Sequence, residues 1–260
     1  MVMGLARRAG RAAAITVAMA AVGSAVTLVT EAVVARARRY GRPDPNLAIR
    51  TSHGDPNLAP TRLVLLGDSS ALGVGVGRVA DTVGGRLAEL LVADGYRVEL
   101  SSVAVMGSRS ADLATQVARA LLGPSPDVAV ILVGANDATG LRRPLDAATA
   151  LGEAVARLCA AGVPVVVGTC PDLGALRAIA PPLRQLLGLL GRRVARAQEA
   201  AVRAAGGVPV DLAALTGAVF RADAGTLSAD GYHPSADGYR VWAHALTPAV
   251  RDAVGVAPHR

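Results

Sequence analysis

The chain has 260 residues, of which 52% are hydrophobic but only 2% aromatic, and its formal net charge is +7. Its aliphatic content is enough to bury a core, which excludes intrinsic disorder, and two cysteines without a glycine repeat exclude a disulfide scaffold and collagen. The charge lies in residues 1–62, which hold nine arginines and three acidic residues. The remainder is nearly neutral and poor in rings that could stack on bases, so we expect no nucleic-acid partner.

Residues 12–30 contain no charged side chain. As a helix, this stretch would be about 28 Å long, close to the thickness of a bilayer core. Three interpretations stay open: a signal anchor, a cleaved signal peptide, or an alanine-rich helix packed on the domain. We favour the anchor, which makes residues 1–40 an apolar segment with basic flanks and predicts membrane association through residues 12–30. Arginines on both sides leave the orientation undecided, and we favour an exported, extracytoplasmic globular part.

Residues 41–61 contain four prolines together with turn-forming Asp, Asn and Gly, which predicts a linker. The globular domain is then residues 62–260. Its two cysteines, Cys159 at the end of a predicted helix and Cys170 after the following strand, should lie too far apart for a disulfide. We expect both to be free thiols.

Short aliphatic runs alternate with helical patterns from Arg62 onward. Strands are predicted at 62–66, 97–103, 127–133, 163–168 and 208–211, and helices at 82–93, 110–122, 144–161, 182–205 and 236–254. Continuous apolar strands are buried on both faces, which is typical of a parallel sheet. The pattern predicts an α/β fold, a three-layer α/β/α sandwich around a five-stranded parallel sheet.

Ligands of such sheets bind beyond the carboxyl ends of the strands, and the chemically informative residues of this chain lie there. Ser69 follows the first strand at a sharp turn beside the next helix, and a serine there can be a nucleophile if a histidine takes its proton. His233 lies in a loop, with Asp230 positioned to orient its ring. The backbone of Gly107 and the amide of Asn136 are candidate oxyanion donors on the same edge. Taken singly, each residue has a common structural explanation, such as a helix cap or a turn.

Together these residues resemble the SGNH, or GDSL-type, serine esterase/lipase family. The resemblance spans about residues 62–254 and rests on four ordered blocks: Gly67-Asp68-Ser69, Gly107, Gly134-Ala135-Asn136-Asp137 and Asp230-Gly231-Tyr232-His233. It implies a flavodoxin-like SGNH hydrolase fold with Ser69 as nucleophile, His233 as general base and then acid, and Asp230 orienting His233. It also implies an oxyanion hole from the Ser69 and Gly107 N–H groups and the Asn136 amide. One departure is Ser70, where the family name expects leucine.

The resemblance implies a serine hydrolase that cleaves carboxylic esters through an acyl-enzyme, on a small-molecule, lipid or carbohydrate ester. An acyltransferase of the same fold and a non-catalytic membrane-associated binding module are the alternatives. We expect no cofactor and no metal site.

Two further features of the sequence, a group of glycines and a group of arginines, lie outside the four blocks. The glycines at 73, 75 and 77 match no phosphate-binding spacing and predict flexible or closely packed backbone beside the site. The arginines at 192, 193 and 196, with Arg203, predict a solvated helix face, with contact to anionic lipid headgroups as the alternative.

Overall fold

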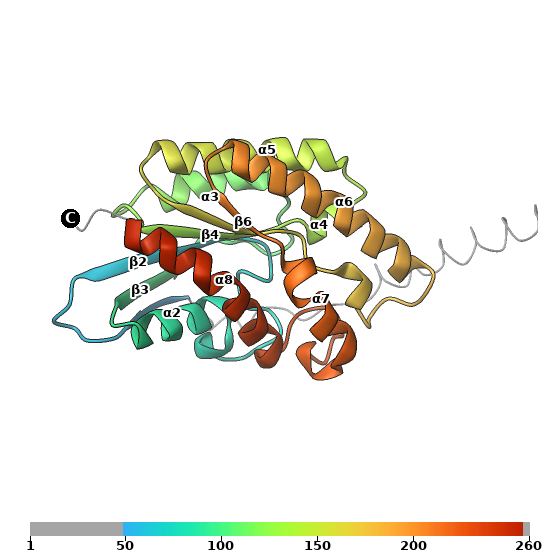
Figure 1. Ribbon diagram of the computed structural model, residues 1–260, viewed down its shortest axis with the longest axis horizontal. Helices are drawn as coiled ribbons and strands as arrows, with labels where there is room; N and C mark the ends of the chain where they lie inside the picture. The colour runs from blue at the N-terminus through green and yellow to red at the C-terminus, as the bar shows by residue number, and fades with distance from the viewer. Residues whose placement is uncertain (1–48, 257–260) are drawn as a thin grey trace, which may run out of the picture.

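The computed structural model describes residues 49–256, and within them six strands form one mixed sheet (Figure 1). They are β1 (Arg50–His53), β2 (Pro60–Gly67), β3 (Arg97–Ser102), β4 (Val128–Leu132), β5 (Val165–Gly168) and β6 (Val208–Val210). Their order is β1-β3-β2-β4-β5-β6, with β1 antiparallel to β3 and all other neighbours parallel. The carboxyl ends of β2 to β6 therefore share one edge of the sheet, which we call the carboxyl rim.

Helices cover both faces of this sheet. They are α2 (Val83–Ala93), α3 (Leu113–Ala120), α4 (Ala135–Thr139), α5 (Pro144–Ala160), α6 (Leu183–Ala204), α7 (Leu212–Ala222) and α8 (Ala236–Val256). Helices α2 and α8 pack on one face, and α3, α5 and the end of α6 on the other. The predicted three-layer sandwich is confirmed.

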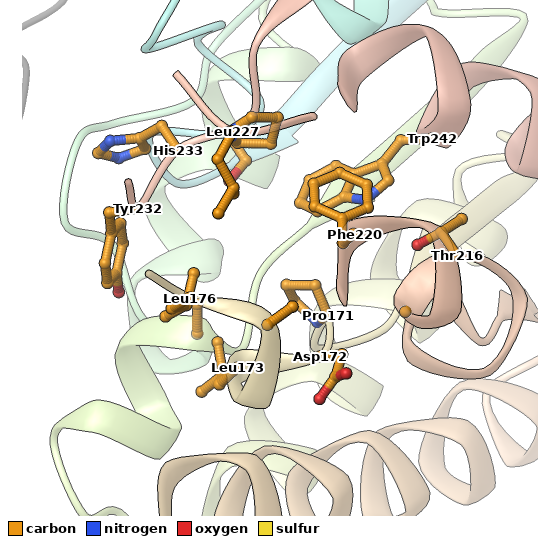
Figure 2. Close-up of a pocket in the computed structure, with 15 residues that line it drawn as sticks. Pro171, Asp172, Leu173, Leu176, Thr216, Phe220, Leu227, Tyr232, His233 and Trp242 are labelled. Atoms are coloured by element: carbon orange, nitrogen blue, oxygen red, sulfur yellow. The ribbon is translucent and has the colours of Figure 1, made fainter. Parts of the chain in front are cut away.

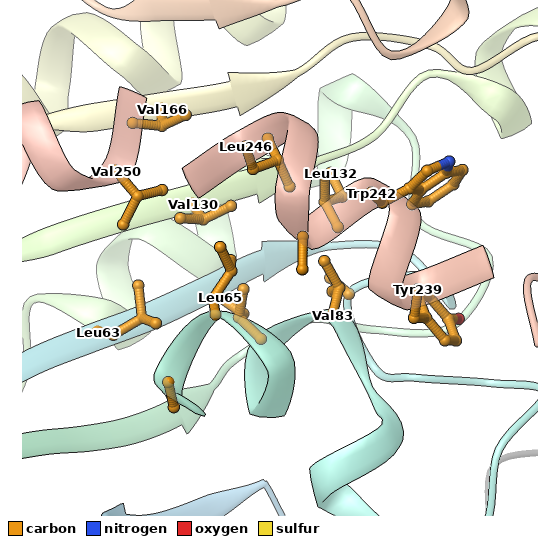
Figure 3. Close-up of a cluster of buried hydrophobic side chains, with 14 of the residues drawn as sticks. Leu63, Leu65, Val83, Val130, Leu132, Val166, Tyr239, Trp242, Leu246 and Val250 are labelled. Atoms are coloured by element: carbon orange, nitrogen blue, oxygen red, sulfur yellow. The ribbon is translucent and has the colours of Figure 1, made fainter. Parts of the chain in front are cut away.

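The alternation of side chains along β2 explains why both faces need a helical layer. Leu63 and Leu65 join the core beneath α2 and α8, which Figure 3 shows, whereas Val64 and Leu66 join the core beneath α3 and α5. All four are buried. Because successive side chains of a strand point to opposite faces, a continuous apolar strand needs cover on both sides.

The sheet has six strands where five were predicted. The additional strand β1 lies within residues 41–61, which were expected to be linker, and it pairs with β3 from Arg50 opposite Ser101 to His53 opposite Val98. Its side chains alternate between exposed and partly exposed because it lies at the sheet edge. An edge strand without a buried face leaves no apolar pattern, which is why the sequence did not indicate it.

Helices α4 and α7 were also absent from the prediction. The signal for α7 is Asp211, whose carboxylate accepts a hydrogen bond from the Ala214 N–H and caps the helix. The five predicted helices are present; the second begins as a short 3₁₀ turn, Ser110–Asp112, before α3.

The apolar segment at residues 12–30 lies outside the described residues, so its role as an anchor stays a prediction. Within residues 49–256, no helix combines the length and the apolarity that crossing a membrane requires. Cys159 and Cys170 are free thiols, as predicted.

Candidate active site

The turn after β2 places Ser69 on the carboxyl rim. Gly67 has φ +132°, and a Cβ added there would lie 1.8 Å from the Leu132 carbonyl oxygen, so only glycine lets β2 end this close to β4. The Asp68 N–H then donates to that same oxygen at 3.0 Å. This contact fixes the direction in which the chain leaves the sheet, and Ser69 follows with 9% of its surface exposed.

The segment after Ser69 differs from the prediction of an adjacent helix. Residues 70–76 form successive turns, with the Val74 N–H donating to the Ser69 carbonyl oxygen, and the next α-helix begins only at Val83. The Ser69 N–H has no acceptor within residues 49–256. This N–H is therefore available to a bound anion, without help from a helix N-terminus.

His233 is held in a loop that closes on itself. Leu227 and Pro234 form an antiparallel bridge, and the Ser228 N–H donates to the His233 carbonyl oxygen at 2.8 Å. Gly75, at φ +107°, lies against this loop so closely that a Cβ would be 2.4 Å from the Pro234 oxygen. Of the glycines at 73, 75 and 77, this one confirms the predicted close packing.

Asp230 collects the hydrogen bonds of this loop. One carboxylate oxygen accepts from the Ser228 hydroxyl and from the backbone N–H groups of Tyr232 and His233, at 2.8 to 2.9 Å. The other accepts from Nδ1 of His233 at 2.7 Å. Burial alone would raise the pKa of Asp230, but the His233 ring and the other donors together hold that pKa well below its ordinary value. Asp230 is therefore ionised at neutral pH.

This ionised carboxylate fixes the state of the imidazole. A carboxylate can only accept, so Nδ1 of a neutral His233 carries the proton and Nε2 keeps its lone pair. Nε2 lies 3.0 Å from the Ser69 hydroxyl oxygen, at a buried position. Ser69, His233 and Asp230 thus form one continuous series of hydrogen bonds. Ser69 and His233 are separated by 164 positions in the chain.

Gly107 and Asn136 lie on neighbouring loops of the same rim. Gly107 has φ +75° in a turn closed by the Ser108 N–H on the Val105 carbonyl oxygen, and its own N–H has no acceptor within residues 49–256. The Asn136 amide nitrogen donates to the Ser108 carbonyl oxygen at 3.0 Å and lies 3.5 Å from a carboxylate oxygen of Asp68. One short bond thus positions the amide, and its second hydrogen has only a long contact.

Gln116, on α3, is a residue that the sequence analysis missed. Its amide oxygen accepts from the Gly67 N–H at 2.7 Å, and its amide nitrogen donates to the Gly67 carbonyl oxygen at 2.9 Å and to the Ser108 hydroxyl at 3.0 Å. It is 1% exposed. Gln116 therefore ties the strand that carries Ser69 to the loop that carries Gly107. A polar residue at a buried helix position was the available signal.

Gln198, on α6, has a similar role at the ends of β4 and β5. It accepts from the Cys170 N–H at 2.8 Å and donates to the Val133 carbonyl oxygen at 3.0 Å, which links the segments that follow those strands. Asp137 in turn accepts from the backbone and hydroxyl of Ser110. The loops on this side of the rim are held by buried side chains from distant elements.

Asp68 is buried beside these groups. Burial raises the pKa of Asp68 to about 6, although the Ser70 N–H and the positive charge of a protonated His233 act against the rise. Its carboxylate accepts from the Ser70 N–H at 2.9 Å. Asp68 thus holds the turn that carries Ser69.

A mostly apolar cavity opens beside His233 (Figure 2). Figure 2 shows His233 and Tyr232 at one end and Phe220 beside Trp242 at the other, with Leu176 and Leu227 between them. The Phe220 and Trp242 rings are 5.8 Å apart. The cavity can hold an apolar part of a substrate molecule whose reacting atom lies at Ser69.

Metal-binding groups do not gather at this site. Among the described residues, no three His, Cys, Asp or Glu side chains lie close enough together to hold a metal ion.

Comparisons of the sequence relate the chain to known proteins. Residues 65–241 match the GDSL-like lipase/acylhydrolase family. A GDSL-like esterase of Mycobacterium tuberculosis is 47% identical over 195 residues, which is 74% of this chain and 62% of the relative. The chain thus spans about three fifths of the length of that curated relative.

Solved structures establish the fold. The crystal structure of TesA has a TM-score of 0.59 at 20% identity, over 74% of this chain and 99% of TesA. A lipase/acylhydrolase from Enterococcus faecalis has a TM-score of 0.56 at 24% identity, over 75% of this chain and 95% of the other.

Proposed function

Because the chain belongs to the GDSL-like lipase/acylhydrolase family, we propose that it hydrolyses carboxylic esters with Ser69, His233 and Asp230 as its catalytic triad. The single observation that carries this proposal is the 3.0 Å contact between Nε2 of His233 and the Ser69 hydroxyl. The alternative of a non-catalytic binding module offers no physical reason for this contact, or for an ionised Asp230 behind the ring.

In the first step the Ser69 oxygen attacks the ester carbonyl carbon while Nε2 takes the hydroxyl proton. Asp230 stabilises the imidazolium that forms and keeps the ring in place. The carbonyl oxygen becomes an oxyanion, which the Ser69 and Gly107 N–H groups and the Asn136 amide receive. The imidazolium then returns the proton to the leaving alkoxide, so that an alcohol departs and an acyl-enzyme remains.

In the second step water takes the place of the alcohol. His233 accepts a proton from the attacking water and returns it to the Ser69 oxygen as the acid leaves. Product analysis in the presence of acceptor alcohols distinguishes hydrolysis from transfer, since a transferase would yield a new ester in place of the free acid.

The cavity between His233 and Phe220 supports a substrate with one apolar arm. Its depth ends on two aromatic rings, so the arm that enters should have a limited length. Two series of esters, one graded in the acyl chain and one in the alcohol, show which arm this is. Phe220→Ala removes one of the two rings at the end of the cavity. It should therefore lengthen the preferred chain in the series whose arm enters the cavity, and leave the other series unchanged.

The decisive experiment is labelling with a fluorophosphonate, which reacts with an activated serine. The wild-type chain should be labelled and should hydrolyse a short-chain chromogenic ester, and Ser69→Ala should do neither. Ser70→Ala is the matched control, because the neighbouring hydroxyl has the same chemistry without the contact to His233. Labelling that persists in Ser69→Ala, or a wild-type chain inert towards a broad ester panel, would contradict the proposal.

A further inference from the structure

A surface of leucine and arginine side chains borders the carboxyl rim on the side of α4 and α6. It consists of Leu141, Arg142, Arg143 and Leu145, between α4 and the first turn of α5, and Leu186, Leu189, Arg192 and Arg193 on α6. We call it the Leu-Arg surface. All eight side chains are exposed.

The exposure of its leucines is unusual in extent. Leu141 is 72% and Leu145 is 75% exposed, whereas Leu187, one residue from Leu186, is buried. Single exposed leucines are ordinary, but here four of them lie on neighbouring elements beside a candidate active site. Leu141 and Leu145 are therefore largely in water, and Leu186 and Leu189 are partly in water, at 40% and 43% exposure.

The backbone at Leu141 supports this view. Leu141 has φ +53° and is the only non-glycine residue between 49 and 256 with a positive φ. Glycine or asparagine normally takes this position at a helix end, because a Cβ is strained there. Hydrogen bonds from the Leu141 and Arg142 N–H groups to the last turn of α4 fix the loop. An exposed leucine is thus held at a conformational cost that a glycine would avoid.

Helix packing places the two halves of the surface on neighbouring elements. Ala138 of α4 packs in one cluster with Leu187 and Val194 on the buried face of α6. A Cβ added to Gly152, at the midpoint of α5, would lie 3.5 Å from Ala201 near the end of α6, so the first turns of α6 extend past the start of α5 (Figure 1). The exposed face of those turns carries Leu186 and Leu189.

The charges of this surface are positive and unpaired. Within the described residues, none of Arg142, Arg143, Arg192 and Arg193 forms an ion pair. Asp146 is the exposed acid beside Leu145. Exposed leucines interspersed with arginines suit the boundary of an anionic bilayer, where alkyl groups enter the acyl region and guanidinium groups meet phosphates. Hot spots of protein interfaces are enriched in tryptophan, tyrosine and arginine and are poor in leucine, so the four leucines, though not the arginines, argue against a protein partner.

We propose that the Leu-Arg surface docks the protein on an anionic lipid bilayer, with the candidate active site facing the lipid. Asn136 and the loop of Leu141 belong to the same short segment after β4, so docking brings ester groups of the bilayer to the rim. The docking itself requires no hydrolysis, and Ser69→Ala should bind as the wild-type chain does.

A tryptophan reporter tests the proposal in the full chain. The chain has one tryptophan, Trp242, which is buried and gives a constant background. Leu145→Trp should show a blue shift with phosphatidylglycerol vesicles and quenching by brominated acyl chains, and little of either with phosphatidylcholine vesicles. Leu122→Trp is the control, since Leu122 is 85% exposed beyond the end of α3, at the opposite end of the sheet. Its emission should not change. Equal responses at the two positions, or none at Leu145→Trp, would overturn the proposal.

The arginines are tested in the same reporter background. Arg142→Ala and Arg143→Ala should each weaken vesicle binding about fivefold, because an arginine near an anionic surface contributes about this factor. Arg119→Ala, an exposed arginine at the far end of α3, should leave binding unchanged. Residues 1–48 are identical in all these variants, so their contribution cancels. Hydrolysis of a soluble short-chain ester should be equal in all of them, which controls for folding.

Two outcomes would reassign the surface. A reporter that responds to a polyglutamate peptide and to neither vesicle would replace the bilayer by an acidic protein partner. A loss of binding with Arg119→Ala as large as with Arg142→Ala would mean that general charge, and not this surface, carries the attraction.

Discussion

The two halves of the candidate site are organised differently. The loop of His233 is built from its own residues, because four donors within residues 228–233 converge on Asp230. The side of Ser69, Gly107 and Asn136 is held by buried groups from other elements, with Gln116 of α3 as the central link. A local loop can be recognised from a short motif, whereas the other half exists only when the whole sheet is assembled.

The largest effect is expected in the His233 loop. His233→Ala should lower kcat for a short-chain ester by roughly 10⁴-fold or more, since the general base is lost. Asp230→Asn should come close to this loss, because the ring is no longer held in the tautomer that leaves Nε2 free. Steady-state kinetics measure both, with thermal unfolding as the control for folding. A variant within tenfold of wild type would contradict the assigned role.

The donor side should tolerate a single loss better. Asn136→Ala should lower kcat by about 10²- to 10³-fold with little change in KM, the usual cost of one oxyanion donor. Ser69 keeps its contact with His233 in this variant, so fluorophosphonate labelling should be slower but complete. An unchanged kcat would remove Asn136 from the oxyanion hole.

A positioning effect is expected for Gln116. Gln116→Leu should lower kcat by roughly 10- to 100-fold, because the side chain no longer holds the Gly107 loop in position relative to Ser69. Gln198→Leu is the matched control: each variant should lower the free energy of unfolding by about 1–3 kcal/mol for every buried partner left unpaired. If the two variants lose equal stability and equal kcat, the special role of Gln116 is refuted.

Asp68, next to the site, and Asp230, within it, should change the stability of the fold in opposite directions as pH rises. Because the folded pKa of Asp68 is raised to about 6, the folded state binds its proton more tightly than the unfolded state does. Asp68 therefore lowers stability as pH rises from about 4 to 6, by about 3 kcal/mol in all. Asp68→Asn should remove this slope and be more stable at pH 8. Denaturant unfolding between pH 4 and pH 8 measures it, and an unaltered slope would contradict the burial effect.

Asp230 should have the opposite effect on how the stability of the fold changes with pH. Its folded pKa lies below the unfolded value, so the ionised carboxylate stabilises the fold above the unfolded pKa, near 3.9, and this stability is lost as pH falls through the folded pKa. Asp230→Asn should therefore be destabilised at pH 7, with a difference from wild type that shrinks in acid. A difference that is constant with pH would show that the charge of Asp230 is not the cause.

The same contrast explains what the sequence predicted. The strands β2 to β6 and the helices α2, α3, α5, α6 and α8 were recognisable, since strands buried on both faces and amphipathic helices repeat with fixed periods. The shorter helices α4 and α7 were not. Ser69, His233 and Asp230 were recognisable from short motifs after strands. Strand β1 was not, because an edge strand has polar side chains, and Gln116 was not, because a glutamine in a helix gives no sign of the backbone it will meet.

The layers of the fold, the chemistry available at the carboxyl rim and the self-contained loop of His233 could be read from local patterns, because each depends on residues close together in the chain. The 3.0 Å approach of His233 to Ser69 and the link from Gln116 to the Gly107 loop arise only when the chain has folded. These features form when the packed sheet brings distant segments of the chain together, and no local sequence pattern encodes where two such segments meet.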